Sequence, residues 1–122
     1  PTQIQAATQD CITFPGSSIS NYQLLGSAQK QVITINGGNH VSFNDADSVA
    51  EIVGGSLFDC PSVIDTYDHH QRLSRRYFTA WLNYFLKQQQ QYEPYLYGTL
   101  ARQDLASQLL TEWQFEMPSV QS

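Results

Sequence analysis

The pattern of apolar and polar positions in the first forty residues predicts a strand, a helix and a second strand. Residues 2–8 form a short apolar stretch and residues 32–35 are β-branched throughout, so each has the composition of a strand. Residues 15–18 break the chain between them, and Ser20 or Asn21 can then cap a helix. Its apolar residues would be Tyr22, Leu24, Leu25 and Ala28. Two strands joined by a short crossover helix indicate a parallel βαβ unit, and hence an α/β fold.

A long amphipathic helix is predicted over residues 67–90. Apolar side chains recur there at spacings of three and four, while most charged side chains fall on another face. The apolar positions are Leu73, Tyr77, Ala80, Trp81, Tyr84 and Phe85, and the other face carries Arg72, Arg75, Arg76, Asn83 and Lys87. An aromatic stripe with this spacing is typical of a helix that packs on a core. We therefore interpret the aromatic residues as packing residues rather than as a cofactor site.

The other segments have weaker patterns. Residues 41–66 are irregular, with a short helix at about 47–53, and form either a lid or a surface insertion packed by its own side chains. Residues 92–98 turn the chain, and Thr99 can cap a last helix. The apolar side of that helix is Leu100, Ala101, Leu105, Leu109 and Leu110. The alternation of Trp113, Phe115 and Met117 then indicates an edge strand or a tail packed on the body.

Two residues with catalytic potential follow the two predicted strands. Asp10 comes just after the first strand, and His40 follows the second across Gly37-Gly38. Loops at the carboxyl ends of strands carry the functional sites of open α/β sheets, so both side chains should lie at one edge. Glycines suit a sharp turn there because they have no Cβ. The simpler interpretation of 37–40 is an ordinary turn with an exposed histidine.

The order of these motifs resembles the C-terminal part of an α/β-hydrolase. Residues 4–15, with Thr8-Gln9-Asp10 followed by Thr13-Phe14-Pro15, are similar to the loop that carries the triad acid. Residues 21–30 resemble the next helix, and residues 32–43 the final strand and histidine loop. Residues 76–86 and 92–98 are similar to the closing region of the dienelactone-hydrolase-like and polyester-hydrolase or cutinase-like branch.

This resemblance implies a fold, a division of the chain and a chemistry. The chain would be the C-terminal βαβ portion of a parallel hydrolase sheet, with a long packing helix and a C-terminal helix. Residues 1–98 would belong to the hydrolase domain, with 41–66 a candidate lid or insertion, and 99–122 would be a helix and tail. Asp10 would be the acid and His40 the base of a Ser-Asp-His triad in a serine esterase.

The nucleophile of such a triad is not visible in the sequence. A nucleophile elbow requires Gly-x-Ser-x-Gly after a strand, and Gly54-Gly55-Ser56 matches only its first part. Ser17 and Ser27 match less well. We therefore expect the serine to lie outside this chain, and the isolated chain to be inactive. Its partner would be a missing N-terminal half or a second copy, and the substrate of the parent a small-molecule or polymeric ester.

Composition excludes some other functions. Six basic and eleven acidic residues give a net charge of −5 with no basic stripe, which argues against nucleic acid as a partner. No apolar run approaches the roughly 18 residues of a membrane span, and the first residues lack the pattern of a signal peptide. Few lysines among many Gln, Ser, Thr and Tyr residues slightly favour export. Cys11 and Cys60 could form one disulfide or stay reduced, but they have no zinc-site spacing.

Two further functions are compatible with parts of the sequence: metal binding and non-catalytic interaction with a partner. Metal binding is suggested by donor types alone, and the spacing of these residues matches no motif, so no metal or cofactor is expected. The candidate donors are His40, Asp45, Asp47, His69 and His70. A non-catalytic interaction module derived from a hydrolase is the second alternative, because a partial sheet leaves unpaired backbone groups at its edge.

Overall fold

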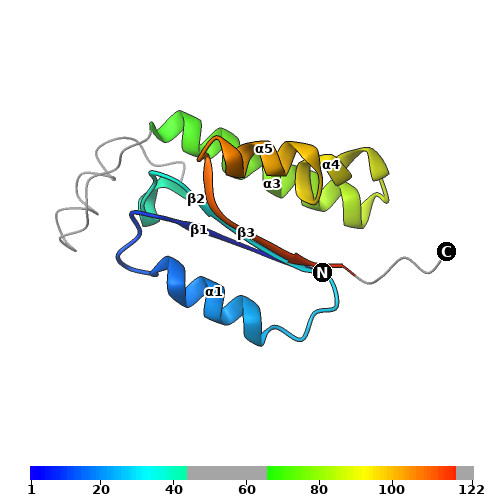
Figure 1. Ribbon diagram of the computed structural model, residues 1–122, viewed down its shortest axis with the longest axis horizontal. Helices are drawn as coiled ribbons and strands as arrows, with labels where there is room; N and C mark the ends of the chain where they lie inside the picture. The colour runs from blue at the N-terminus through cyan, green and yellow to red at the C-terminus, as the bar shows by residue number, and fades with distance from the viewer. Residues whose placement is uncertain (44–65, 118–122) are drawn as a thin grey trace.

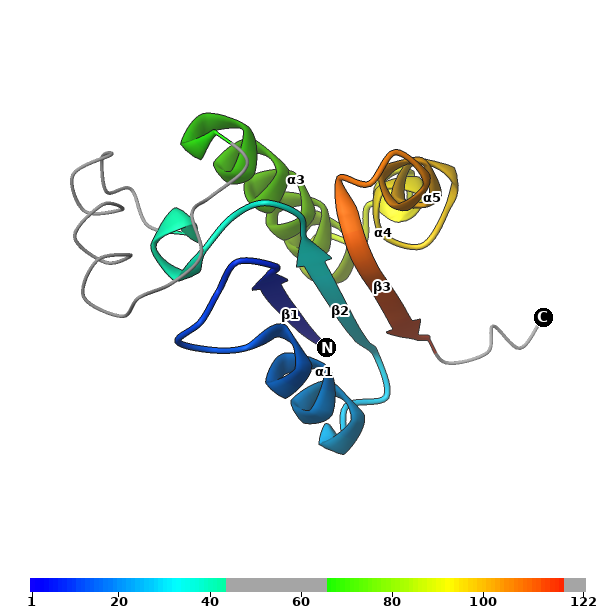
Figure 2. The same ribbon diagram turned by 60° about the vertical axis from the view of Figure 1, so that its left-hand side comes forward.

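The computed structural model describes residues 1–43 and 66–117, which form a three-stranded mixed sheet with helices on both faces (Figure 1). The elements in chain order are β1 (Thr2–Ala7), α1 (Pro15–Leu24), β2 (Lys30–Ile35), the 3-10 helix η1 (His40–Phe43), α3 (Tyr67–Leu86), the 3-10 helix η2 (Gln90–Tyr92), α4 (Glu93–Leu96), α5 (Thr99–Ala106) and β3 (Leu110–Glu116). Helix α1 covers one face of the sheet, and α3, α4 and α5 cover the other (Figure 2). The chain is therefore broadly α/β. The predicted helix at 47–53 and most of the candidate lid lie outside the described residues.

The sheet has the order β1-β2-β3, with β2 in the centre. β1 and β2 are parallel, with Ile4 opposite Val32, as the predicted βαβ unit requires. β3 runs antiparallel to β2, with Gln114 opposite the same Val32. The expectation of a purely parallel sheet was therefore wrong for the third strand, and the alternation from Trp113 to Phe115 marks an edge strand. Every residue of β2 is buried, because it is covered by a strand on each side and by helices on each face.

Helix α1 begins and ends earlier than predicted. It starts at Pro15 after Phe14, whose side chain makes no capping hydrogen bond, and it ends at Leu24. The expected cap at Ser20 or Asn21 was wrong, since both residues lie inside the helix. Proline has a fixed φ that suits the first helical position and lacks only an N–H that would be unpaired there, so it starts the helix instead of breaking the chain.

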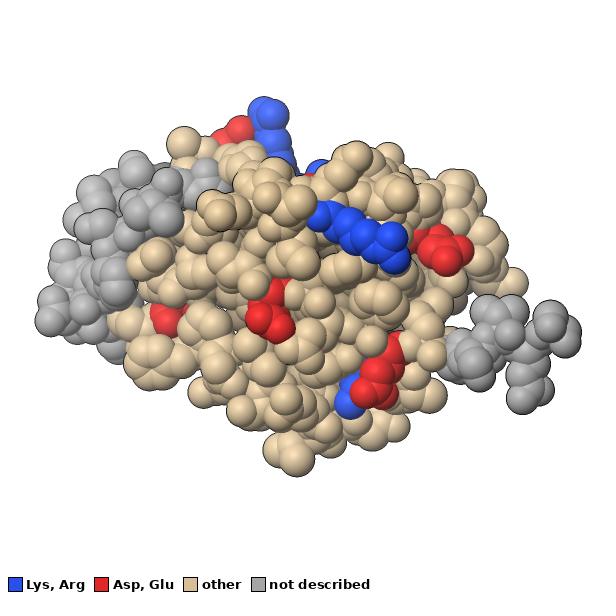
Figure 3. All heavy atoms as spheres, in the orientation of Figure 1, with Lys and Arg blue, Asp and Glu red and all other residues tan. Residues whose placement is uncertain are grey.

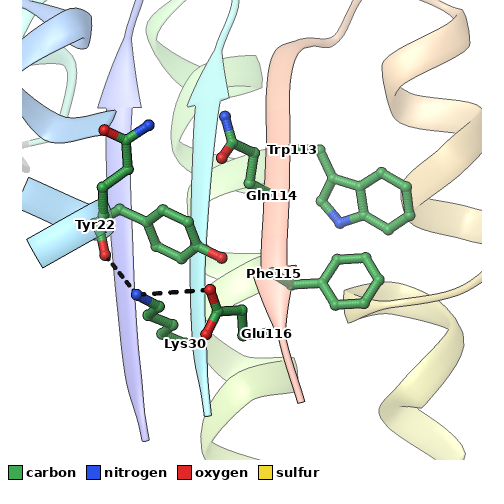
Figure 4. A pocket seen from close by; sticks show the side chains of 7 residues that line it. Tyr22, Lys30, Trp113, Gln114, Phe115 and Glu116 are labelled. Carbon is green, nitrogen blue, oxygen red and sulfur yellow. Dashed lines mark hydrogen bonds and ion pairs between the residues drawn. The ribbon is translucent and has the colours of Figure 1, made fainter. Parts of the chain in front are cut away.

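Lys30 joins the end of α1 to the sheet (Figure 4). Its side chain is 5% exposed, and its Nζ donates hydrogen bonds to the carbonyl oxygens of Tyr22 at 2.9 Å and Leu25 at 3.1 Å. The carboxylate of Glu116 on β3 lies 3.8 Å from the same Nζ, and the Tyr22 ring lies beneath it. A cation at the C-terminal end of a helix satisfies carbonyls that have no intrahelical partner. Lys30 thus fixes α1 against both β2 and β3.

The main core lies between β2 and the helices of the α3 face. Tyr77, Ala80 and Trp81 of α3 pack with Ile33 and Ile35, which confirms the interpretation of the aromatic stripe. The other members of the cluster are Leu73, Leu96, Tyr97, Ala101 and Leu110, with Tyr84 and Phe85 packed against it.

The segments after α3 are more regular than predicted. α3 ends at Leu86, because Gln88 has a positive φ of 56° that no helix continues through. The expected turn at 92–98 includes the short helix α4, and α5 starts after Gly98 with no side-chain cap, so the predicted role of Thr99 as a cap was wrong. α5 ends at Ala106, and Leu110 opens β3 rather than continuing the helix.

A buried polar cluster fastens α5 to α3. Asp104 of α5 accepts a hydrogen bond from the Tyr77 hydroxyl at 2.7 Å, and the guanidinium of Arg76 contacts the same carboxylate oxygen. Asp104 is 6% exposed and Tyr77 is fully buried. Both partners are hydrogen-bond donors, which a carboxylate can accept from. The cluster thus holds α5, the helix that precedes the edge strand β3, against α3.

Charged side chains are scattered over the face of the molecule shown in Figure 3 rather than gathered into one field. The described acidic residues lie on loops, helices and β3, and several of them have a basic partner nearby. Among the described helices, none has the length and apolar character needed to cross a membrane.

Candidate functional site

The parallel pairing of β1 and β2 brings the two loops after these strands side by side. The N–H of Thr8 donates to the carbonyl of Ile35 at 3.1 Å, and the N–H of Gln9 donates to the carbonyl of Gly38 at 2.9 Å. The Thr8 hydroxyl also accepts from the N–H of Gly37 at 2.8 Å. Backbone pairing thus continues beyond the strands themselves. The loops that follow are held together before any functional side chain is considered.

Asp10 is buried at the start of the first loop and is held by the backbone that follows it. Its Oδ1 accepts hydrogen bonds from the N–H groups of Ile12 at 2.9 Å and Thr13 at 2.8 Å. Aspartate commonly folds the next residues around its own carboxylate in this way. One carboxylate oxygen is occupied by the turn, so the other is presented in a fixed direction.

His40 contacts the second carboxylate oxygen of Asp10. The Nδ1 atom of His40 lies 3.1 Å from Oδ2 of Asp10, and the His40 side chain is 46% exposed while that of Asp10 is 5% exposed. When the neutral imidazole carries its hydrogen on Nδ1 it donates to the carboxylate, and Nε2 is then left as an acceptor. The structure therefore brings together the two predicted site residues, in the arrangement that orients a histidine for proton transfer.

The two glycines before His40 have separate structural roles. Gly37 has a φ of 93°, a region that side chains rarely adopt. Gly38 lies against the buried ring of His70 on α3, so closely that a Cβ atom there would be 2.1 Å from Nδ1 of that ring. The rings of His70 and Phe43 are also packed in a T-shaped arrangement, with their centroids 4.6 Å apart. The histidine loop is thus seated directly on α3.

A reciprocal pair of hydrogen bonds closes the turn that carries His40. The N–H of Asn39 donates to Oγ of Ser42 at 3.0 Å, and the N–H of Ser42 donates to Oδ1 of Asn39 at 3.2 Å. Both residues are buried. This pair was not predicted from the sequence, and neither was the contact that Thr8 and His70 each make with the histidine loop. An Asn followed three residues later by Ser is a recognisable capping pattern, whereas nothing local connects His70 to Gly38.

Of the other residues proposed as metal ligands, the structure describes only the neighbours His69 and His70. His69 is exposed while its neighbour His70 is fully buried. Asp45 and Asp47 lie outside the described residues. Within the two described segments, no group of three or more His, Cys, Asp and Glu side chains could hold a metal ion.

None of the serines considered as nucleophiles contacts His40 in the described segments. Ser17 is exposed near the start of α1, and the hydroxyl of Ser27 is hydrogen bonded to that of Thr2 at 2.8 Å. Ser56 lies outside the described residues. Cys11, which follows Asp10, is disulfide-bonded and is thus not a free thiol; Cys60 also lies outside the described residues.

Comparison with known proteins assigns no identity to this site. No protein-family model matches the chain, and the search of curated proteins found no match. The features that indicate a function are therefore the geometry of Asp10 and His40 and the order of the elements that carry them.

Proposed function

We propose that this chain supplies the acid and base of a serine-type ester hydrolase, with Asp10 as the acid and His40 as the base. The nucleophilic serine would lie outside this chain. The observation that carries the proposal is the contact of 3.1 Å between Oδ2 of the buried Asp10 and Nδ1 of the half-exposed His40. His40 would remove the proton from the serine as it attacks the ester carbonyl, and would then donate it to the leaving alcohol. Asp10 would hold the ring and stabilise the imidazolium.

The order of elements supports the relationship to α/β-hydrolases proposed here. In that fold the acid and the histidine each follow a strand, in this order along the chain. Asp10 follows β1 and His40 follows β2, and the two strands are parallel neighbours joined through α1. The antiparallel strand β3 covers the far edge of β2, so a larger sheet could extend only from β1 or β3.

The edge of β1 is the place where we expect the rest of the hydrolase to join. This edge has no strand partner among the described residues, and a parallel strand is normally covered on both sides. Beside it, Phe78 of α3 is 56% exposed, and a groove next to β1 is lined by Gln3, Gln5 and Phe78. Strands and a helix carrying the serine would cover these groups.

A fluorophosphonate probe tests the proposed chemistry. The chain is purified without denaturation together with any polypeptide bound to it, treated with the probe, and analysed by intact mass. We expect a labelled serine, and a labelling rate at least about 100-fold lower for His40→Gln, because the base is lost. Asp68→Asn, which removes an exposed carboxylate on α3, is the matched control and should leave the rate unchanged. Absence of label on every associated polypeptide, while a control hydrolase reacts, would overturn the proposal.

The histidine ring provides a second test in the chain itself. Nitrogen-15 NMR distinguishes the two neutral tautomers, and we expect the hydrogen of His40 to be on Nδ1, facing Asp10. Asp10→Asn places an amide beside Nδ1 and should shift the population toward the Nε2–H form. An unchanged tautomer in this variant would show that Asp10 does not orient the base.

A non-catalytic interaction module is the second candidate function. It is favoured by the same unpartnered edge of β1 and the exposed Phe78, which would pair with a partner whether or not chemistry follows. The two functions differ in one measurement. Replacing His40 leaves assembly intact in both, and abolishes ester hydrolysis by the assembled species only if that species is an enzyme.

A further inference from the structure

A groove on the outer side of α3 combines cationic and aromatic side chains. It lies between α3 and the η2–α4 segment and has a volume of about 400 Å³. Its lining residues are Arg72, Arg75, Arg76, Thr79, Ala80, Tyr92 and Tyr95. None of these belongs to the Asp10–His40 site. Three of the six Lys and Arg residues of this acidic chain are therefore placed along one groove.

The three arginines differ in how their charges are balanced. Arg72 forms an ion pair with Asp68 one turn earlier, and Arg76 is paired with Asp104. Arg75 has no ion pair among the described residues, and its Nε donates to the carbonyl of Gln71 at 3.3 Å. Its two terminal nitrogens are the groups left to bind a ligand. An arginine guanidinium recognises a carboxylate through two parallel hydrogen bonds.

The rest of the groove is suited to a flat apolar body. Tyr92 and Tyr95 are half-buried, with ring centroids 6.2 Å apart, and the buried Ala80 adds apolar surface to the groove lining. Aromatic rings bind other rings by stacked or edge-to-face contact. The volume also falls within the range of small-molecule sites.

We propose that this groove binds a small aromatic carboxylate, with Arg75 holding the carboxylate and Tyr92 and Tyr95 contacting the ring. The pocket next to Lys30 contrasts with it, because the Lys30 ammonium is already surrounded by two carbonyls and a carboxylate (Figure 4). Arg75 is exposed, and no acidic side chain of the described residues pairs with its charge. This site does not depend on the proposed hydrolase chemistry.

Titration of the full chain with 2-naphthoate, followed by amide NMR, tests the proposal. We expect a dissociation constant of about 0.1–1 mM, since a ligand of this size bound at an exposed arginine gains little free energy. Shift changes should concentrate on residues 72–80 and 92–95. Arg75→Gln should weaken binding about fivefold to tenfold, because it removes the cation that has no ion pair. Arg102→Gln, which removes an exposed arginine on α5, is the matched control and should change binding less than twofold.

The uncharged analogue 2-naphthamide tests the role of the carboxylate. It should bind to the unaltered chain at least about fivefold more weakly than 2-naphthoate does. The chain with Arg75→Gln should bind the acid and the amide equally. Equal binding of acid and amide to the unaltered chain would overturn the proposal. Shift changes outside the groove, or equal weakening by Arg75→Gln and Arg102→Gln, would overturn it as well, because binding would then reflect only general charge attraction.

Discussion

Asp10 and Asp104 are equally buried aspartates that have different partners. Each is 6% exposed, and each uses its carboxylate in more than one contact. Asp10 accepts from two backbone N–H groups and faces the half-exposed imidazole of His40. Asp104 accepts from the buried Tyr77 hydroxyl and contacts the guanidinium of Arg76. Burial and hydrogen bonding alone therefore do not distinguish a carboxylate with a structural role from one with the proposed catalytic role.

The protonation chemistry of the partner makes the difference. An arginine keeps its proton in proteins, and burial raises the pKa of Tyr77 to about 12, although the nearby Arg76 opposes this increase. The partners of Asp104 thus stay hydrogen-bond donors through the physiological range. A histidine can take up and release a proton in that range. Asp10 therefore faces an imidazole, the kind of group that the proposed proton transfer requires, whereas Asp104 faces two hydrogen-bond donors.

Replacing each aspartate by alanine should give the largest difference in stability between the two sites. We expect Asp104→Ala to lower the free energy of unfolding by about 3 kcal/mol, because it leaves the buried Tyr77 hydroxyl and the partly exposed Arg76 without their acceptor. Asp10→Ala should cost about 1 kcal/mol, since water can reach the exposed Ile12 and Thr13 region. Urea unfolding measures both, with the exposed Asp68→Ala as control. Equal losses at positions 10 and 104 would remove the distinction.

Alkaline pH should lower the stability of the fold through two buried tyrosines, Tyr77 and Tyr97. Burial raises the pKa of Tyr77 to about 12, and burial is also the main cause of the raised pKa of Tyr97. The unfolded chain loses these protons near pH 10, before the folded chain does, so stability is full below about pH 10 and falls as the pH rises toward 12. The loss from Tyr77 alone should reach about 2 kcal/mol. Stability measured against pH should decline less steeply in Tyr77→Phe; an unchanged decline would contradict the assignment.

At neutral pH, replacing Tyr77 or Tyr97 by phenylalanine should change stability in different ways, and by less than the changes above. Tyr77→Phe removes the hydrogen bond to Asp104 and should cost about 1 kcal/mol. The Tyr97 hydroxyl is buried with no hydrogen-bond partner within the described segments, so Tyr97→Phe should leave stability unchanged or raise it slightly. Thermal unfolding of the two variants distinguishes them. A larger loss for Tyr97→Phe would show that its hydroxyl has a partner.

Local patterns predicted the first two strands and the long helix, and the two strands in turn predicted that Asp10 and His40 lie together. Parallel neighbouring strands place their following loops together, so composition and order were sufficient. The relationship to α/β-hydrolases stays a prediction, because the geometry of two residues does not establish a family.

Features that depend on distant parts of the chain could not be predicted. The contact of Asp104 with Arg76 exists only after α5 has docked on α3, and the need for glycine at position 38 comes from His70 beneath it. The strand at 110–116 was ambiguous because three alternating apolar residues fit an edge strand or a packed tail equally well. The predicted start of α1 was wrong because proline usually interrupts a helix. It is tolerated in the first turn, and α1 begins at Pro15.

The position of β2 also constrains the order in which this protein can assemble. This central strand pairs with β1 early in the sequence and with β3 near the end of the described chain. During synthesis, the first pair can form around α1 while one side of β2 still lacks its final partner. Long-range pairing of this kind slows folding and leaves an apolar strand open to wrong partners in the meantime. Full protection of the β2 amides from hydrogen exchange should therefore come late in folding, after β3 has paired.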